Sequence, residues 1–305
     1  MENTRAKTTR NSLILLLTAT IWGMAFVSQS KGMDYMHPFT FNGVRSLIGA
    51  AGILVYILIS RKIAGDKAAK LDWKLNVRAG LLCGIFLTIA STLQQFGIKY
   101  TSVGKAGFIT TLYIIFVPMF GVFLKKKVAP VVWAAAGMAA VGMYLLCMTE
   151  SLRLGAGDIM VFLCAIAFAI QIMTVDHYAA RIDGAVVSCI QFTVCGVVCC
   201  IGALIWGQPT FGQIQEGLGA LLYAGVLSCG VGYTLQIVGQ KGLNPTVAAL
   251  IMSLESVIAT ISGWIAYKIG FLSTDQTLTP RQIAGCIIVF AAVILVQLPP
   301  EWFRF

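Results

Sequence analysis

The segment LQQFGIK at residues 93–99 recurs as LQIVGQK at residues 235–241, so the pattern Leu-Gln-x-x-Gly-x-Lys occurs twice, 142 positions apart. The same separation aligns further identical residues without a gap: Ala106 with Ala248, Leu112 with Leu254 and Gly121 with Gly263. A separation of 146 aligns the preceding parts: Ala19 with Ala165, Trp22 with Phe168 and Arg45 with Gln191. Because these matches keep their order along both halves, they predict an internal repeat over residues 12–149 and 157–298.

The composition around these segments excludes a soluble globular protein. Hydrophobic residues make up 58% of the 305 positions, charged residues only 11%, and the mean hydropathy is +0.85. A soluble domain has about 25% charged residues, which cover its surface. In a bilayer the outer surface is solvated by lipid instead, so the composition predicts an integral membrane protein.

Apolar runs of about 18 to 24 residues, separated by short polar breaks, predict an all-α protein with ten transmembrane helices. At a rise of 1.5 Å per residue, most runs just cross a hydrocarbon core of about 30 Å. We place the spans near 12–30, 39–60, 77–97, 103–124, 130–149, 157–176, 185–206, 214–238, 245–267 and 281–298. Each half then has five spans, an odd number, so the two repeats enter the membrane in opposite directions. Inverted repeats are typical of secondary transporters with a midplane site.

The distribution of basic residues predicts the orientation. With the N-terminus inside, fifteen of the 22 Lys and Arg residues fall in inside segments and six in outside segments, while Arg45 lies within a span. This excess predicts a multi-pass protein of the plasma (inner) membrane with both termini in the cytoplasm. Because the basic residues occupy short gaps between spans, the net charge of +10 does not indicate a nucleic-acid partner.

Sequence motifs for cofactor, metal and nucleotide chemistry are not found. The nine cysteines all lie within apolar runs, where cysteine usually acts as a small hydrophobic residue. They form no CxxC motif and have no histidine at metal-ligand spacing. No Walker A sequence occurs, and neither does H-E-x-x-H or G-x-S-x-G. We therefore expect no metal, no cofactor and no ATP hydrolysis by this chain.

Ionisable residues within spans are costly, so each of them needs an explanation. Glu255 lies ten residues past Pro245, about 15 Å into the membrane. It is either a ligand for a substrate amine or a proton-titrating carboxylate, or else a protonated structural residue. Arg45 could bind a substrate carboxylate in bidentate fashion, but an arginine at its depth more often extends to the interface or pairs with backbone carbonyls. Asp158 is expected to be a first-turn acid that faces the helix dipole.

Aromatic and amide side chains complete the predicted site. The aromatic candidates for cavity lining are Trp22, Phe26, Tyr113 and Tyr233, although packing and lipid contact are commoner roles. Tyr113 is the repeat partner of Glu255, so the two are predicted to face each other across a pseudo-twofold axis. Amides within spans contact either substrate or a neighbouring helix. The amide candidates are Gln94, Gln95, Gln171 and Gln236, while Gln191 is a further amide within a span.

The chain resembles the drug/metabolite transporter superfamily, specifically proteins with two EamA-type domains. The segments that carry the resemblance are Trp22-Gly23-x-x-Phe26, Pro38-Phe39-Thr40-Phe41 leading to Arg45, Gly157-Asp158, Leu254-Glu255 and Gln282-x-x-Gly285. The resemblance implies a ten-helix basket that moves small metabolites such as amino acids, often outward. This chain departs from the family pattern at Ser256, where relatives often have proline. It also lacks the Gly-Glu that often ends spans four and nine, so no role of those acids is carried over.

We therefore predict a secondary transporter or facilitator, an exporter of small metabolites, with alternating access around a midplane cavity. One alternative is an intramembrane lipid-handling enzyme that uses Glu255 with Arg45, although the remaining acids lie in loops or at span ends. Another is a non-transporting scaffold, although the longest loop, about 61–76, is short. The expected partners are a small-molecule substrate, the bilayer and, if transport is coupled, protons.

Overall fold

The computed structural model describes residues 2–65, 71–125, 128–147, 155–273 and 275–297, and within these ranges it contains helices and no strand. The first half contains α1 (Glu2–Gly32), α2 (Pro38–Ala64), α3 (Trp73–Ile98), α4 (Val103–Thr111), α5 (Tyr113–Phe123) and α6 (Pro130–Cys147). The second half contains α7 (Ala156–Tyr178), α8 (Gly184–Gly202), η2 (Ala203–Gly207), α9 (Phe211–Glu216), α10 (Leu218–Leu222), η3 (Tyr223–Gly232), α11 (Tyr233–Gly239), α12 (Pro245–Met252), α13 (Leu254–Lys268) and α14 (Pro280–Gln297).

Eight helical segments of the described chain are long and apolar enough to cross a membrane. They are Lys7–Gly32, Pro38–Ala64, Trp73–Ile98, Val103–Phe123, Ala156–Tyr178, Gly184–Gly207, Leu218–Gly239 and Pro245–Lys268. The expected spans 130–149 and 281–298 correspond to α6 and α14, whose apolar segments Pro130–Gly142 and Pro280–Leu295 are shorter. Residues 148–149 and 298 lie outside the described residues. The all-helical membrane class is therefore confirmed, whereas the count of ten spans stays a prediction.

Helix starts follow from capping residues in the short connections. Asp72, Ser102, Asp183 and Asn244 each accept a hydrogen bond from a backbone N–H of the helix that follows, which satisfies one of its free donors. His37 caps α2 in the same way through the Phe39 N–H. Burial, together with nearby Lys99, lowers the pKa of His37 and so favours the neutral ring that can accept this bond. Each of these caps therefore starts a helix directly after the connection that precedes it.

Two of the apolar spans are interrupted near their middle. Leu112 separates α4 from α5, and Ser253 separates α12 from α13. At both breaks a hydroxyl donates to the carbonyl three residues earlier: Thr111 to Phe108 at 2.8 Å, and Ser253 to Leu250 at 2.7 Å. Such bonds compete with the regular backbone pattern and often bend helices. The breaks place the first turns of α5 and α13 inside the protein.

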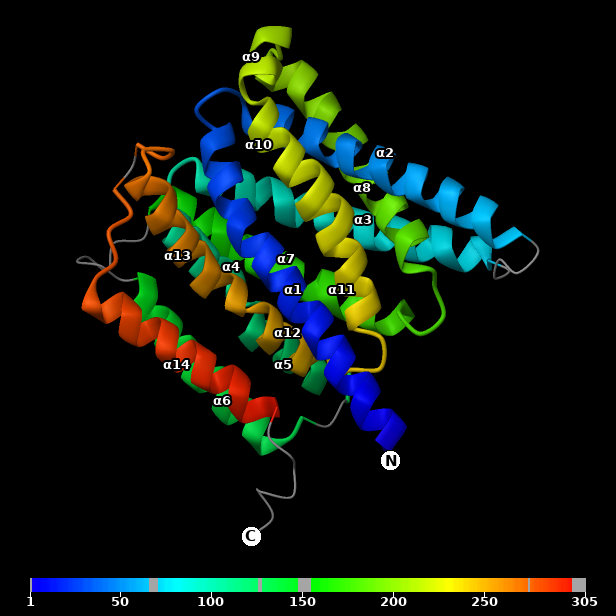
Figure 1. Cartoon of the computed structure of the whole chain (residues 1–305), viewed down its shortest axis with the longest axis vertical. Helices are drawn as coiled ribbons and strands as arrows, with labels where there is room; N and C mark the ends of the chain where they lie inside the picture. Colours follow the sequence, from blue (N-terminus) through cyan, green and yellow to red (C-terminus); the bar gives the residue numbers. More distant parts are fainter. Residues whose placement is uncertain (1, 66–70, 126–127, 148–154, 274, 298–305) are drawn as a thin grey trace.

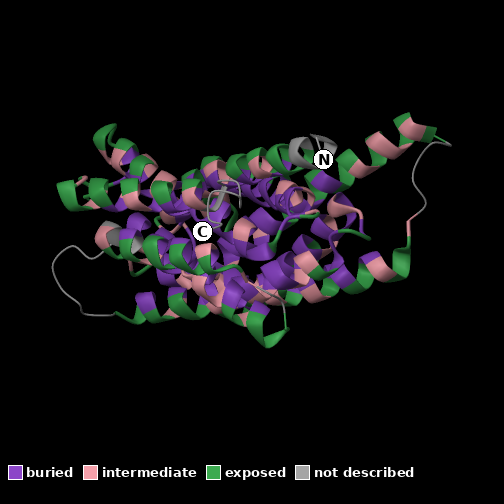
Figure 2. Cartoon of the chain, turned by 90° about the horizontal axis from the view of Figure 1, so that it is seen from below, coloured by how far each residue is buried: buried purple, intermediate pink, exposed green. Residues whose placement is uncertain are grey.

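α1 crosses the molecule between α13 on one side and η3 with α11 on the other (Figure 1). α3 packs on α7, α2 packs on α8, and α6 lies beside α14. Buried residues gather in the middle of the bundle, whereas the outer faces carry exposed large hydrophobic side chains (Figure 2). An apolar exterior around a partly polar interior fits a lipid solvent.

Candidate substrate-binding cavity

A small cavity lies at the centre of the bundle and has a volume of about 30 Å³. One water needs at least about 10–15 Å³, so the space holds about two waters. The walls come from both halves of the chain. The lining residues are Trp22, Phe26, Gln29, Arg45, Ser46, Leu87, Ser91, Gln94, Thr110, Tyr113, Phe168, Gln171, Ile172, Phe192, Ser228, Cys229, Tyr233, Gln236 and Glu255.

Tyr113 and Glu255 form the polar contact that joins the two interrupted spans. The Tyr113 hydroxyl donates a 3.0 Å hydrogen bond to Glu255 Oε1, and both residues are buried. Tyr113 opens α5 and Glu255 lies in the first turn of α13. The N-terminus of a helix carries a partial positive charge, which favours a carboxylate at this place. The structure therefore brings the repeat partners into direct contact and places the acid on the cavity wall.

Arg45 is buried, whereas an arginine at its depth in a membrane more often extends to the interface. It is 5% exposed, so it does not extend to the membrane interface. Its guanidinium forms no ion pair and no hydrogen bond to a carbonyl among the described residues, and its Nε is buried without an acceptor. The side chain instead lines the same cavity as Glu255. The cavity thus contains one cationic and one acidic side chain that are not paired with each other.

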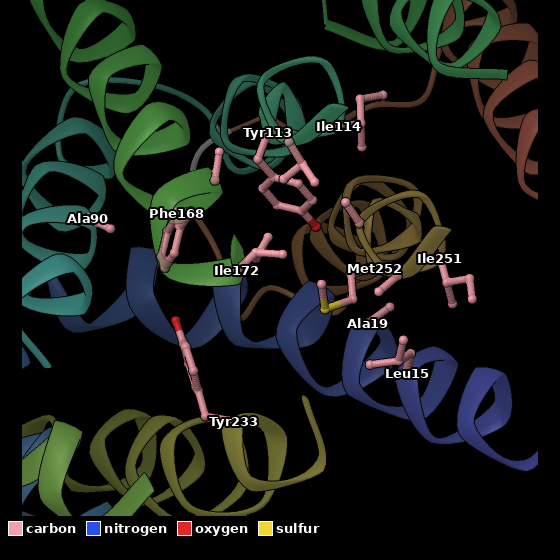
Figure 3. Close-up of a cluster of buried hydrophobic side chains, with 14 of the residues drawn as sticks. Leu15, Ala19, Ala90, Tyr113, Ile114, Phe168, Ile172, Tyr233, Ile251 and Met252 are labelled. Carbon is pink, nitrogen blue, oxygen red and sulfur yellow. The ribbon is translucent and has the colours of Figure 1, made fainter. Parts of the chain in front are cut away.

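Aromatic rings close much of the remaining wall. The Trp22 and Tyr233 rings lie 4.5 Å apart, centre to centre, and the Phe192 ring lies 5.0 Å from Tyr233 in an edge-on arrangement. Trp22 also donates from Nε1 to the Ser228 carbonyl at 3.4 Å, which ties α1 to η3. Figure 3 shows Tyr113 and Tyr233 entering the core from opposite sides, with Ile172 between them and Phe168 to one side. Apolar and aromatic side chains combined with fixed polar groups are typical of ligand sites.

The amide side chains divide into three arrangements. Gln171 and Gln236 hydrogen-bond each other, at 3.4 and 3.1 Å, across α7 and α11. Gln94 donates to Thr110 Oγ1 at 3.2 Å. Gln95 donates to the backbone carbonyl of Gln29 at 3.2 Å and does not line the cavity. All four predicted amides therefore form hydrogen bonds between helices. Three of them, Gln94, Gln171 and Gln236, also line the cavity.

Nine of the ten residues predicted for the site line this one cavity, and only Gln95 lies outside it. Their role in binding substrate stays a prediction. Gln29 was not predicted, although it is an amide within the first span and so has the same feature that selected the other glutamines. Sequence reasoning also missed residues that carry no signal distinguishing a wall from packing: Ser46, Leu87, Ser91, Thr110, Phe168, Ile172, Phe192, Ser228 and Cys229.

Asp158 does more than face the dipole of its own helix. It is 4% exposed and accepts hydrogen bonds from Gly155 N–H, Thr101 Oγ1 and Lys105 Nζ, at 2.9, 2.9 and 2.6 Å. The contact with Lys105 is an ion pair between α7 and α4. Asp158 therefore joins the second half of the chain to the first at the end where both helices begin. The sequence alone gave no sign of this partner.

Comparisons with known proteins agree over nearly the whole length. Residues 10–148 and residues 155–298 each match the EamA-like transporter family. An uncharacterized transporter of Archaeoglobus fulgidus is 28% identical, covering 93% of this chain and 84% of that protein. The uncharacterized transporter YwfM of Bacillus subtilis is 24% identical, covering 95% and 94%. A crystal structure at 16% identity superposes with a TM-score of 0.74, covering 97% of this chain and 99% of the other, which supports the fold alone.

Proposed function

This chain belongs to the EamA-like transporter family, and we propose that it is a secondary transporter or facilitator that exports small metabolites such as amino acids. The family and the names of the relatives indicate a transporter rather than an enzyme. The observation that carries the proposal is the central cavity, where Arg45 and Glu255 face the same space within a membrane protein. A dipolar metabolite carries a negative group that could bind Arg45 and a positive group that could bind Glu255.

Three observations support two inverted five-helix repeats, 12–149 and 157–298. The family matches the chain twice, over 10–148 and 155–298. The interrupted spans are a repeat pair with breaks at nearly equivalent positions, Leu112 and Ser253. Fourteen of the nineteen lining residues also form pairs at the separations 142 and 146: Trp22–Phe168, Phe26–Ile172, Ser46–Phe192, Leu87–Cys229, Ser91–Tyr233, Gln94–Gln236 and Tyr113–Glu255. A cavity between inverted repeats fits alternating access.

Transport by this route requires the helices to move. A cavity of about 30 Å³ has no room for an amino acid, so it must widen before such a substrate can bind. The segment η3 is a π-helix of ten residues that contains Gly225, Gly230 and Gly232, and π segments are rare and frequent at functional sites. We assign η3 as the hinge that widens the cavity. The Lys105–Asp158 ion pair is the contact that opening at that end would break.

The proposed topology is ten spans in the plasma membrane with both termini in the cytoplasm. The basic-residue count of fifteen against six supports it. In the structure, α1 begins and α14 ends at the same end of the bundle, which fits an even number of crossings (Figure 1). Fusion of a reporter active only in the cytoplasm to each end tests this topology. Activity at one end alone would contradict it.

The substrate is best found by comparing metabolites. Cells that express the protein and cells that express the Glu255→Gln variant are grown in parallel, and the medium is compared without a preselected target. We expect a small set of metabolites, amino acids among them, to accumulate only with the wild type. Equal media from cells with equal amounts of both proteins would contradict export that depends on Glu255. An imposed pH gradient that changes vesicle uptake would indicate proton coupling, and unchanged uptake would indicate facilitation.

A further inference from the structure

The guanidinium of Arg45 is a buried cation that has no ionic partner among the described residues. The Phe41 ring, whose centre lies 5.4 Å from Cζ, is a cation–π partner of the guanidinium. A cation–π contact of this kind offsets only part of the cost of removing the charge from water. Burying an isolated charge is far more costly than burying a paired one. A residue kept in this environment is therefore expected to meet an anion during function.

The elements around Arg45 contain no such anion. α2 packs against α3, α8, η2, α10 and η3. None of these six elements contains an aspartate or glutamate. The cavity has one acidic residue among its lining residues, Glu255, which is hydrogen-bonded to Tyr113 and forms no ion pair among the described residues. The helices that pack around Arg45 in the described part of the chain therefore offer it no carboxylate.

We infer that Arg45 is the anion subsite of the cavity and that the transported substrates carry a carboxylate which its guanidinium binds. This inference rests on the proposed transport function. The planar fork of N–H donors matches a carboxylate in bidentate geometry. Tyr233, whose hydroxyl points into the core in Figure 3, lines the same cavity and offers a further donor. Both groups lie on the cavity wall, where an entering substrate reaches them.

The surroundings favour a carboxylate over a phosphate. The lining residues include one cation and no lysine, and Glu255 shares the space, so a dianionic phosphate would be poorly neutralised. About half of the lining residues are aromatic or aliphatic, including Phe168, Ile172 and Phe192, and these can contact an apolar part of a substrate. The substrate class is therefore a small monocarboxylate with an apolar remainder, and an ammonium group on it would have Glu255 as its partner.

A matched set of three probes tests the subsite: leucine, isoamylamine, which lacks the carboxylate, and isocaproate, which lacks the ammonium group. Binding to the purified full-length protein is followed by the shift of its thermal unfolding midpoint, and transport by uptake into vesicles. We expect leucine and isocaproate to stabilise the wild type and isoamylamine, which has only Glu255 as a charged partner, to stabilise it much less than leucine does. Arg45→Gln, which places in α2 the residue found at the repeat position Gln191, should weaken carboxylate binding by roughly 10- to 100-fold.

The controls separate the subsite from the proposed function. Lys62→Gln removes an exposed cation from the same helix and should leave binding and transport unchanged. The unfolding midpoint without ligand should not fall in Arg45→Gln, because a neutral amide is cheaper to bury than an unpaired cation. If the wild type binds isoamylamine as well as leucine, or binds none of the three, the carboxylate subsite is wrong. Export of other metabolites would then still support the proposed function, whereas a wild type that exports nothing rejects the transporter itself.

Discussion

The Tyr113 hydroxyl donates to Glu255 Oε1 over 3.0 Å, and the two residues are 142 positions apart in the chain. The separation is the one that aligns the LQ-x-x-G-x-K segments, so the contact joins equivalent points of the two halves. Both residues lie at the start of a helix that follows a mid-span break. The bond thus fixes the two interrupted spans to each other at the cavity and is a contact that opening would have to rearrange.

Tyr113→Phe tests the structural value of this bond. The substitution removes the hydroxyl and leaves Glu255 Oε1 without that donor, so we expect a loss of about 1–3 kcal/mol in unfolding free energy. Thermal or denaturant unfolding of the purified protein measures it. Tyr56→Phe, on an exposed part of α2, is the matched control and should change stability by less than about 0.5 kcal/mol. Equal losses of unfolding free energy in the two variants would mean that this hydrogen bond does not stabilise the protein.

Gly23 explains part of the Trp22-Gly23-x-x-Phe26 motif. A Cβ atom on Gly23 would lie 2.6 Å from Ile258 Cβ and 2.7 Å from the Glu255 carbonyl oxygen, so α1 and α13 approach as closely as they do only with glycine. We expect Gly23→Ala to move α13 and to impair transport as well as stability. Gly52→Ala, which meets nothing within 4 Å, should be neutral or slightly stabilising. Normal transport in Gly23→Ala at normal protein levels would show that the close approach is not needed.

The Lys105–Asp158 ion pair should contribute more to stability than the exposed pair Lys31–Asp34. Asp158 is buried and has three donors, whereas Asp34 is 54% exposed. We expect Asp158→Asn to lower the unfolding free energy by about 1–3 kcal/mol; the loss is not larger because Lys105 is partly exposed to solvent. We expect Asp34→Asn to lower the unfolding free energy by less than about 1 kcal/mol. Combining Asp158→Asn with Lys105→Gln should cost less than the sum of the single effects. Strict additivity would contradict a direct interaction.

Much of the fold follows from simple physical patterns in the sequence. Apolar run lengths, short connections with capping residues, and the repeated heptapeptide predicted the helices and the Tyr113–Glu255 contact. The burial of Arg45 did not follow, because an arginine near a span end usually extends to the interface. Lining residues such as Leu87 and Phe168 could not be predicted either, since the same apolar residue types occur in packed cores and in cavity walls. The Lys105–Asp158 pair depends on how α4 meets α7, which no local pattern specifies.

Counterflow in vesicles tests the central claim most directly, because a carrier with alternating access exchanges substrate on the two sides and an open channel does not. Proteoliposomes preloaded with an unlabelled exported metabolite receive a labelled trace outside. We predict a transient accumulation of label with the wild type, reduced at least about tenfold in Glu255→Gln and Glu255→Ala because the cavity loses its acidic ligand. Label that only equilibrates with the wild type, or the same accumulation in all three proteins, would contradict alternating access around Glu255.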